Sequence, residues 1–342
     1  MIKLFNTKKE IKLNKFIGRG GRFLILREAK KRKINCQVLI QKGRKKEDED
    51  VLFIRFEKNG KKRWLSPQRG YFNPKQACEL ALFKDLTYQI LKSVNIPIPN
   101  YRKIEKIRDL KKMEIKFPLV IKPIAQAKGK DVLIGIDNEI RLKKSLRKLL
   151  KKYSSLLVEE FIPGNDYRLL ILDNKLIGAV QRIQPKVKGN GKKTIRELIK
   201  RSNRKREEEP KEFRPFLKNL EIDQGMRQCL RKQGYTLKSI LEEDKIISVR
   251  QNANFTTGGE IRDVTDKIHP DNIKIAKKAV QSLGLKLGGV DITTQDISQS
   301  ILENEGRVLE VNGIPGIWIH HFPHKGKKRN ISRKIIDYLF KE

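Results

Sequence analysis

Two short apolar runs near the C-terminus, joined through Gly306, constrain the fold of this chain most. The first run, GVDITTQ, carries Asp291, and the second, RVLEVNGIPG, carries Glu310 and Asn312. Runs of this length, bounded by glycine and polar residues, predict neighbouring strands of a sheet. Because residues two apart on a strand point to the same face, Glu310 and Asn312 share a face that Asp291 can join from the adjacent strand.

These three oxygen-bearing side chains form a candidate magnesium site. Mg²⁺ is a hard cation that proteins usually hold with a few oxygens plus substrate phosphates. Solvated acids at the rim of a sheet would produce the same pattern. The Gly-Ile-Pro-Gly segment that follows, residues 313–316, favours the metal site, because such a turn lets backbone approach a ligand.

The overall composition excludes some classes of protein. With 342 residues, the chain is long enough for two or three subdomains with a sizeable core. It has no apolar run as long as a membrane span and no signal-peptide pattern at Met1. Its three cysteines, Cys36, Cys78 and Cys229, lie far apart and form no C-x-x-C motif, which predicts a cytoplasmic protein.

The charge is strongly positive, since 78 Lys and Arg stand against 40 Asp and Glu, a net +38. A nucleic-acid or anionic-membrane partner would explain this excess, and so would a compositional bias spread over the whole surface. Short basic clusters occur throughout the chain, and none is interleaved with aromatic residues as a base-stacking platform requires. The distribution therefore favours compositional bias, although the charge would still attract nucleotide or polyanionic substrates.

Turn and cap residues predict several elements. Near the N-terminus we expect strands at 23–26 and 38–40 around a helix at 27–33, then a hairpin that turns at Asn59-Gly60. Together these predict a small α/β domain. A single helix should begin at Asn73-Pro74, with Asn73 as its cap, and continue to about Ile90.

The middle of the chain contains further cap and turn residues. Asn138 should cap a basic helix that ends near residue 152, and a hairpin should turn at Asp173-Asn174. Thr194 and Glu197 form a capping box, which predicts the start of a helix. The charged stretch 201–215 is expected to be an exposed loop.

Four groups of residues could together bind ATP. Lys122 at the end of a strand can reach phosphate oxygens, and the loop 125–131, with Gly129 and Lys130, can cover phosphates. The strand 158–162 can offer its backbone to adenine and a carboxylate to ribose. The Asp291, Glu310 and Asn312 cluster completes the set. Each group alone is also explained without ATP binding, as a solvated lysine, an ordinary loop or an outward-facing acid.

Arginines and glycines supply candidate substrate contacts. Arg168 and Arg182 lie on the two arms of the predicted hairpin, and Arg250 precedes a segment that ends in Thr257-Gly258-Gly259. Arginine binds carboxylates and phosphoryl groups in a bidentate manner, and bare backbone N–H groups can stabilise a developing oxyanion. Any one of these arginines could instead form a surface salt bridge.

In this order, these residues resemble the ATP-grasp ligases, and in particular the ATP-grasp part of cyanophycin synthetase and of bifunctional glutathione synthetases. The matching segments are VEEFIPGNDYR (158–168), GNG followed by TIREL (189–198), RQNANFTTGGEIRDVTDKIH (250–269), the two predicted metal strands, and a closing H…P…G…R run over 320–329. The resemblance covers roughly 83–331, with a weaker similarity over 17–75.

The resemblance implies an α+β (α/β) ATP-grasp fold, in which two α+β lobes clamp ATP. A small α/β pre-ATP-grasp domain over 1–82 would precede an ATP-grasp domain over 83–342, whose lid would span about 115–160. The implied activity is that of an ADP-forming carboxylate–amine ligase, which makes an amide or peptide bond through an acyl phosphate. ATP and Mg²⁺ are the implied cofactors, with two ions expected and Mn²⁺ as an alternative.

The resemblance also assigns roles to residues. The ATP-binding set is Lys84, Lys122, Gly129, Lys130, Glu159, Glu160, Phe161, Ile162 and Asp166, and the metal ligands are Asp291, Glu310 and Asn312. The catalytic set is Arg250, Asn254, Gly258 and Gly259, and the substrate-binding set is Arg168, Arg182, Trp318 and His320. Two departures stand out, because the phosphate loop lacks the family's other glycines and Trp318 replaces an arginine in the expected acceptor pocket.

Three functions remain open on the sequence. The favoured one is a ligase for amino acids or small peptides. A second is a ligase of the same fold that modifies a protein or peptide terminus and recruits an acidic chain through its basic surface. The third is a non-enzymatic, basic nucleic-acid-binding protein on a decayed scaffold. No membrane partner is expected, and relatives suggest a homodimer or homotetramer.

Overall fold

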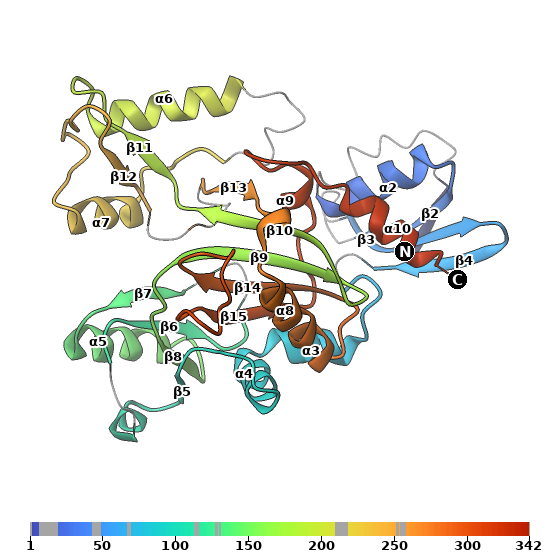
Figure 1. The fold of residues 1–342 in the computed structure, drawn as a ribbon, viewed down its shortest axis with the longest axis horizontal. Helices are drawn as coiled ribbons and strands as arrows, with labels where there is room; N and C mark the ends of the chain where they lie inside the picture. The colour runs from blue at the N-terminus through green and yellow to red at the C-terminus, as the bar shows by residue number, and fades with distance from the viewer. Residues whose placement is uncertain are drawn as a thin grey trace. The chain divides into compact units, whose positions relative to one another are not determined.

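The computed structural model describes residues 2–6, 20–42, 49–66, 70–112, 116–126, 129, 131–208, 218–250, 253 and 258–341. The chain divides into two compact units (Figure 1). Unit 1 consists of Met1–Ala179, Val264–His321 and Lys328–Glu342, and unit 2 consists of Val180–Asp263 and Phe322–Lys327. None of the described helices has both the length and the hydrophobicity that crossing a bilayer requires.

The N-terminal part of unit 1 is a four-stranded sheet in the order β1-β2-β3-β4. Its strands are β1 (Ile2–Asn6), β2 (Asn35–Lys42), β3 (Glu49–Lys58) and β4 (Lys61–Leu65). The predicted hairpin between β3 and β4 is confirmed. Asn59 and Gly60 have φ values of 49° and 73°, and two consecutive positive φ angles define the tight turn that suits a two-residue hairpin.

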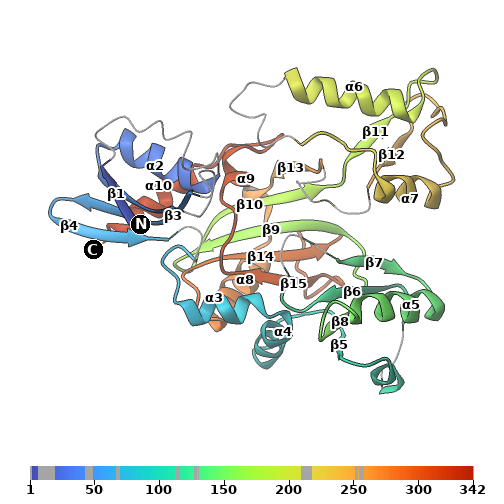
Figure 2. The same ribbon diagram turned by 180° about the vertical axis from the view of Figure 1, so that it is seen from behind.

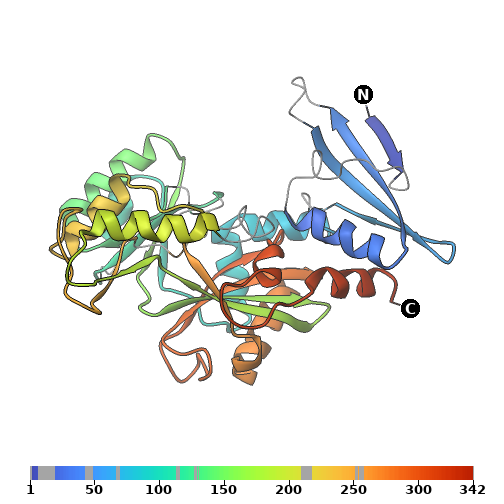
Figure 3. The same cartoon turned by 90° about the horizontal axis from the view of Figure 1, so that it is seen from above.

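Helices α2 (Gly21–Lys31) and α10 (Ile331–Leu339) lie side by side (Figure 3) and share one hydrophobic core with this sheet. The expected strand at 23–26 is wrong, because these residues lie inside α2. Leu24, Ile25, Leu26 and Ala29 are buried there at helical spacing. A short apolar run is compatible with a strand or a buried helix, and packing against α10 decides for the helix.

The expected single helix after residue 73 is also wrong, because it is split into α3 (Lys75–Leu82) and α4 (Lys84–Ser93). The backbone of Phe83 is extended, with φ −87° and ψ 102°. The N–H of Lys84 donates to the carbonyl of Ile124 at 3.3 Å. A tertiary hydrogen bond therefore takes the place of a helical one at the split, where Lys84 begins α4.

Asn73 does not cap α3, since its side chain is engaged elsewhere. Its amide nitrogen donates to the carbonyls of Leu287 at 2.8 Å and Gly313 at 2.9 Å. Its amide oxygen accepts from the N–H groups of Lys286 and Leu287 at 2.8 and 2.9 Å. The same residue thus joins the chain before α3 to the start of β14 and to the Gly313–Gly316 turn.

A second four-stranded sheet of unit 1 has the order β5-β8-β6-β7. Its strands are β5 (Tyr101–Ile104), β6 (Leu119–Pro123), β7 (Leu133–Ile136) and β8 (Leu156–Glu160), and a 3-10 helix, η1 (Ile107–Lys112), follows β5. Helix α5 (Glu139–Leu150) packs against this sheet (Figure 2) through Leu142, Leu146 and Leu149. The predicted cap is confirmed, because the side chain of Asn138 accepts from the N–H of Arg141 at 2.9 Å.

The third sheet carries most of the candidate site. Within unit 1 it runs β10-β9-β14-β15, with β9 (Asn165–Leu172), β10 (Lys175–Ile183), β14 (Leu287–Thr294) and β15 (Arg307–Asn312). The predicted β9–β10 hairpin turns at Asp173 and Asn174, whose φ values are 46° and 58°. Helix α8 (Pro270–Ser282) packs on this sheet, and η4 (Thr265–Lys267) and α9 (Trp318–His321) complete the unit. Every residue of β14 is buried.

Unit 2 has its own core, which includes Val187, Leu198, Met226 and Val249. The end of β10 pairs with β13 (Glu260–Asp263), and β11 (Lys186–Lys188) pairs with β12 (Ile246–Ser248). Two helices, α6 (Ile195–Glu208) and α7 (Gln224–Lys232), pack there.

The capping box at the start of α6 is confirmed, because the backbone N–H of Thr194 donates to Glu197 at 2.8 Å and the N–H of Glu197 donates back at 3.3 Å. The loop expected at 201–215 is wrong over 201–208, where α6 continues. Residues 209–217 lie outside the described part of the chain. A capped helix with one buried stripe tolerates a highly charged exposed face, which is why composition alone misled here.

Candidate functional site

The two predicted metal strands are neighbours, as expected. β14 and β15 are antiparallel, with Asp291 directly opposite Glu310 and Gly289 opposite Asn312. A register shift follows Asp291, as in a β-bulge, and such shifts re-aim side chains next to functional sites. The two carboxyl residues and Asn312 therefore lie on one face of the sheet.

Each of the two carboxylates is paired with a cation. Arg168, opposite Asp291 on β9, donates from Nε to one carboxylate oxygen and from its terminal nitrogen to the other, the latter at 2.8 Å. Lys84 Nζ lies 3.5 Å from a Glu310 oxygen. Burial alone would lower the pKa of Arg168, but the carboxylate of Asp291, with Glu310 nearby, raises it above its usual value. Arg168, predicted to bind substrate, is thus already engaged with Asp291.

The chemistry of this face fits a hard divalent cation. It offers two carboxylates and one amide, and all three are oxygen donors of the kind that Mg²⁺ prefers. Within the described residues, no group of three or more His, Cys, Asp or Glu side chains is placed to hold a metal ion. A metal here would depend on Asn312 and on oxygens from a bound phosphate, and its binding stays a prediction.

A buried cluster lies beside this face. Lys122 Nζ on β6 is 2.8 Å from an Oε atom of Glu159 on β8. The hydroxyl of Tyr88 on α4 lies 2.9 Å from that same Glu159 oxygen and 2.9 Å from the carbonyl of Leu309, the residue before Glu310. Tyr88 is not among the residues that the sequence predicted for this site. Its position four residues after Lys84, on the same face of one helix, was the available signal.

The two neighbouring acids at the end of β8 have different partners. Glu159 is buried against Lys122, whereas Glu160 accepts from the backbone N–H of Asn100 at 2.9 Å and from its side-chain amide at 3.1 Å. Both predicted ribose contacts are therefore engaged within the protein. Phe161, by contrast, is 37% exposed, and Ile162 follows it directly after the strand.

Asp166 and the phosphate loop complete the predicted ATP set. Asp166 on β9 accepts from the hydroxyl of Thr293 on β14 at 2.9 Å. Gly129 has a φ of 69°, which only glycine adopts freely. At the start of this loop, Lys84 Nζ donates to the carbonyl of Gln126 at 2.6 Å. Lys130 lies outside the described residues.

His320 is buried, with only 1% of its surface exposed. Within the described part of the chain neither ring nitrogen has a hydrogen-bond partner. A Cβ at Gly178 would come within 2.9 Å of His320 Nδ1, so glycine at that position makes room for the ring. Burial, followed by the positive charge of Arg168, lowers the pKa of His320 to about 3. The imidazole is therefore neutral at physiological pH.

The neighbouring His321 gives a pH-dependent prediction. The N–H of Ser332 donates to its Nε2 at 3.1 Å, which requires that nitrogen to be unprotonated. Burial, followed by Arg27, lowers the pKa of His321 from 6.5 to about 4. An unfolded chain therefore binds this proton at a higher pH than the folded chain. The free energy of unfolding should fall as the pH drops from 6.5 to about 4, by on the order of 3 kcal/mol from this residue.

His321→Gln keeps an acceptor for Ser332 but does not titrate. Urea unfolding at pH 7 and at pH 4.5 should show a smaller loss of stability in this variant than in the wild type. Equal losses in the two proteins would show that His321 does not titrate as the burial argument requires. His320 contributes to the remaining slope in both proteins, because its pKa is also lowered.

The residues predicted to be catalytic lie in unit 2. Arg250 donates to the carboxylate of Asp223 and to the carbonyl of Glu221, both at 2.9 Å. Gly258 has a φ of 91°, and its carbonyl accepts from Arg206 at 2.8 Å. Gly259 follows it before β13, and Arg182 lies on β10 opposite Ile261 of β13. Asn254 lies outside the described residues.

Trp318 is the first residue of α9, in unit 1. It follows the Gly313–Gly316 turn, and a Cβ at Gly316 would lie 3.3 Å from its indole nitrogen. The turn that follows β15 therefore packs against the residue expected in the acceptor pocket.

Comparison with a solved structure identifies the fold. The crystal structure of a bifunctional glutathione synthetase from Pasteurella multocida superimposes with a TM-score of 0.64 at 21% identity, over 92% of this chain and 43% of that chain. This likeness confirms the expected ATP-grasp fold.

Sequence comparison then identifies the domain. Residues 82–202 match the family model of the RimK-like ATP-grasp domain. The cyanophycin synthetase of Trichormus variabilis is 35% identical over 268 residues, which make up 77% of this chain and 29% of that protein. The glutathione biosynthesis bifunctional protein GshAB of Clostridium perfringens is 33% identical over 265 residues, 75% of this chain and 34% of that protein.

These findings confirm the resemblance to the ATP-grasp ligases. The chain spans about a third of the length of the two curated relatives. Both are named for biosynthetic reactions.

Proposed function

We propose that this protein is an ATP-dependent carboxylate–amine ligase that forms an amide or peptide bond and releases ADP and phosphate. One observation carries the proposal. Asp291 and Glu310 are paired across adjacent strands, and Lys84 forms an ion pair with Glu310. The carbonyl of Leu309, the residue before Glu310, accepts a hydrogen bond from Tyr88, which belongs to the buried cluster with Lys122 and Glu159. Paired acids and converging lysines are what binding of a metal-chelated triphosphate requires.

The proposed reaction has two steps. A carboxylate oxygen of the acid substrate attacks the γ-phosphorus of ATP, the bond to the β,γ-bridging oxygen breaks, and ADP leaves. The amine of the second substrate then attacks the acyl carbon, loses a proton, and expels phosphate with its bonding electrons. Such chemistry depends on positioning and charge neutralisation more than on a protein nucleophile.

The chain's residues take defined parts in this scheme. Lys122 and Lys84 neutralise phosphate oxygens, and the hinge at Phe161 and Ile162 receives the adenine. Asp291, Glu310 and Asn312 would hold Mg²⁺, or Mn²⁺, which when bound neutralises phosphate charge. Arg250 and the N–H groups of Gly258 and Gly259 would stabilise the negative charge that develops during transfer. Arg182, Trp318 and His320 are proposed to contact the substrates.

The substrate class proposed is an amino acid or a small peptide, as the names of the relatives suggest. The domain boundary at residue 82 or 83, the lid at about 115–160, the homo-oligomer and the cytoplasmic location stay predictions.

The test measures ADP release with Mg·ATP and pools of amino acids or short peptides, with and without hydroxylamine. Hydroxylamine converts an acyl phosphate into a hydroxamate, so a hydroxamate that forms with one acid pool identifies the acid substrate before the amine is known. ADP release without hydroxamate would indicate a different phosphoryl acceptor. A wild-type protein that neither binds nor turns over Mg·ATP would overturn the proposal.

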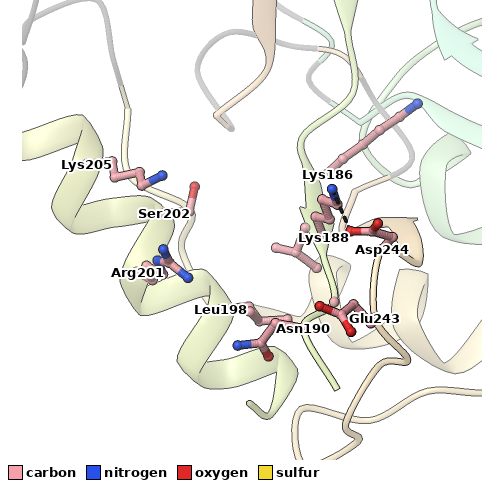
Figure 4. A pocket seen from close by; sticks show the side chains of 11 residues that line it. Lys186, Lys188, Asn190, Leu198, Arg201, Ser202, Lys205, Glu243 and Asp244 are labelled. Atoms are coloured by element: carbon pink, nitrogen blue, oxygen red, sulfur yellow. Dashed lines mark ion pairs between the residues drawn. The ribbon is translucent and has the colours of Figure 1, made fainter. Parts of the chain in front are cut away.

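One feature of unit 2 favours the second candidate function, a ligase that acts on an acidic peptide or protein terminus. An open pocket of about 430 Å³ lies between β11 and α6 (Figure 4). Arg201 and Lys205 line it from α6, and on the opposite wall Lys188 pairs with Asp244 at 2.6 Å. Arg201 and Lys205 form no ion pair within the described residues, so both are available to a carboxylate.

The pocket is tested by removing these two charges. Arg201→Ala/Lys205→Ala should weaken binding of a peptide of ten aspartates about tenfold, measured by fluorescence anisotropy, since exposed charge pairs contribute up to ~1 kcal/mol each. Arg147→Ala/Lys151→Ala on and after α5 removes the same charges at the same spacing and serves as the control. Equal weakening in both variants would mean that the overall charge, and not the pocket, recruits the peptide.

A further inference from the structure

Tyr88 occupies the centre of the buried cluster in unit 1. Its side chain is fully buried, and three polar atoms surround its hydroxyl at the same distance. Lys122 Nζ, a Glu159 carboxylate oxygen and the carbonyl oxygen of Leu309 all lie 2.9 Å away. These partners come from β6, β8 and β15, whereas Tyr88 itself comes from α4.

The hydrogen-bond roles in this cluster are restricted. Lysine can only donate, so Lys122 donates to the Tyr88 oxygen and also to Glu159, 2.8 Å away. The single hydroxyl proton of Tyr88 is then shared between the carboxylate of Glu159 and the carbonyl of Leu309. Burial, followed by the charge of Glu159, raises the pKa of Tyr88 well above its usual value, so the phenol stays protonated.

The geometry points to Tyr88 as a positioning residue that fixes the phosphate-binding lysine Lys122 relative to the metal-binding strand β15. The inference rests on the proposed function, because it names what holds that site together. The Tyr88 hydroxyl is hydrogen-bonded to the carbonyl of Leu309, next to Glu310 on β15. It also accepts from Lys122 on β6, the lysine proposed to bind phosphate. Tyr88 therefore couples the nucleotide half of the site to its metal half.

The ring of Tyr88 makes apolar packing contacts, whereas its hydroxyl makes the hydrogen bonds. The ring packs with Ile124 and Leu157 and lies against Tyr101, with the ring centroids 4.9 Å apart. Phenylalanine keeps this packing and removes only the hydroxyl. Tyr88→Phe thus leaves Lys122 and Glu159 paired with each other but free to reorient, and it leaves the Leu309 carbonyl without its buried donor.

The experiment compares the wild type, Tyr88→Phe and Tyr101→Phe. The Tyr101 control removes a hydroxyl from the adjacent ring. Affinity for a fluorescent ATP analogue is measured at several Mg²⁺ concentrations. Losing a hydrogen bond to charged partners should weaken nucleotide binding by Tyr88→Phe about tenfold. The dependence of that affinity on Mg²⁺ should also become shallower, because the link to β15 is lost. A purely structural role would lower the melting temperature without changing this dependence.

A second readout does not depend on nucleotide. Acetylation of Lys122 by a water-soluble anhydride, followed by mass spectrometry, reports how firmly its amine is held, and it should be several-fold faster in Tyr88→Phe than in Tyr101→Phe. Unchanged Mg²⁺ dependence together with unchanged acetylation would overturn the positioning role. If the wild type binds no nucleotide, the proposed function fails, and the acetylation rates alone then decide whether Tyr88 holds Lys122.

Discussion

Replacing Glu310 with glutamine should reduce ADP release about 10²- to 10⁴-fold, which corresponds to the several kcal/mol that a bound metal ion contributes to phosphoryl transfer. Glutamine fills the same space and keeps an oxygen, so the fold should be retained. It removes the negative charge that faces Lys84 and that the proposed metal ion would require. Steady-state kinetics at saturating Mg·ATP, together with a melting curve, measure the effect.

Glu303→Gln is the matched control, since it makes the same change at an exposed position in the segment between β14 and β15. Its ADP release should equal that of the wild type. A Glu310→Gln variant that retains wild-type turnover would remove Glu310 from the metal site. Turnover that recovers at high Mg²⁺ would instead support the assignment, because weaker metal binding is overcome by mass action.

Arg168→Met is expected to show the largest effect on stability, a loss of about 3–5 kcal/mol in the free energy of unfolding. Methionine keeps much of the aliphatic stem that lies against Gly289. The guanidinium is lost, however, and with it the ion pair that offsets the negative charge of the buried Asp291 carboxylate. Urea unfolding without divalent metal measures the loss.

Magnesium should return part of that stability, because it places positive charge next to Asp291 in the variant. Its addition should therefore raise the melting temperature of Arg168→Met more than that of the wild type. Combining Arg168→Met with Asp291→Asn removes both charges, and this double variant should be more stable than Arg168→Met alone and should no longer respond to Mg²⁺. Identical responses to Mg²⁺ in all three proteins would contradict a metal site at Asp291.

Local sequence predicted those elements that local chemistry determines. The turns at Asn59-Gly60 and Asp173-Asn174 need positive φ angles, which Asn, Asp and Gly adopt most readily, and both are present. Asn138 and Thr194 act as predicted because a helix cap is a contact over three residues. That Asp291 and Glu310 share a face of neighbouring strands also followed from the sequence, through the period of a strand and the joining segment 295–306.

The partners of the site residues were beyond such reasoning. Glu159 and Glu160 are adjacent, yet one binds Lys122 and Tyr88 in the interior and the other binds Asn100. These partners lie far away in the sequence, and only the packing of α4, β6 and β8 brings them together. The break between α3 and α4 has the same origin, since a carbonyl at Ile124 takes the Lys84 N–H. Tertiary contacts of this kind override local propensity.

The bonds of Asn73 and Tyr71 bear on how this protein can be engineered. Asn73 fills all four hydrogen-bonding positions of its amide with the backbone of Lys286, Leu287 and Gly313. The Tyr71 hydroxyl donates to the carbonyl of Pro315 at 3.0 Å. A chimera that imports a relative's N-terminal segment must therefore place its junction before Tyr71. A later junction would bring in the relative's residues at positions 71 and 73, and with them a different set of bonds to the turn that follows β15.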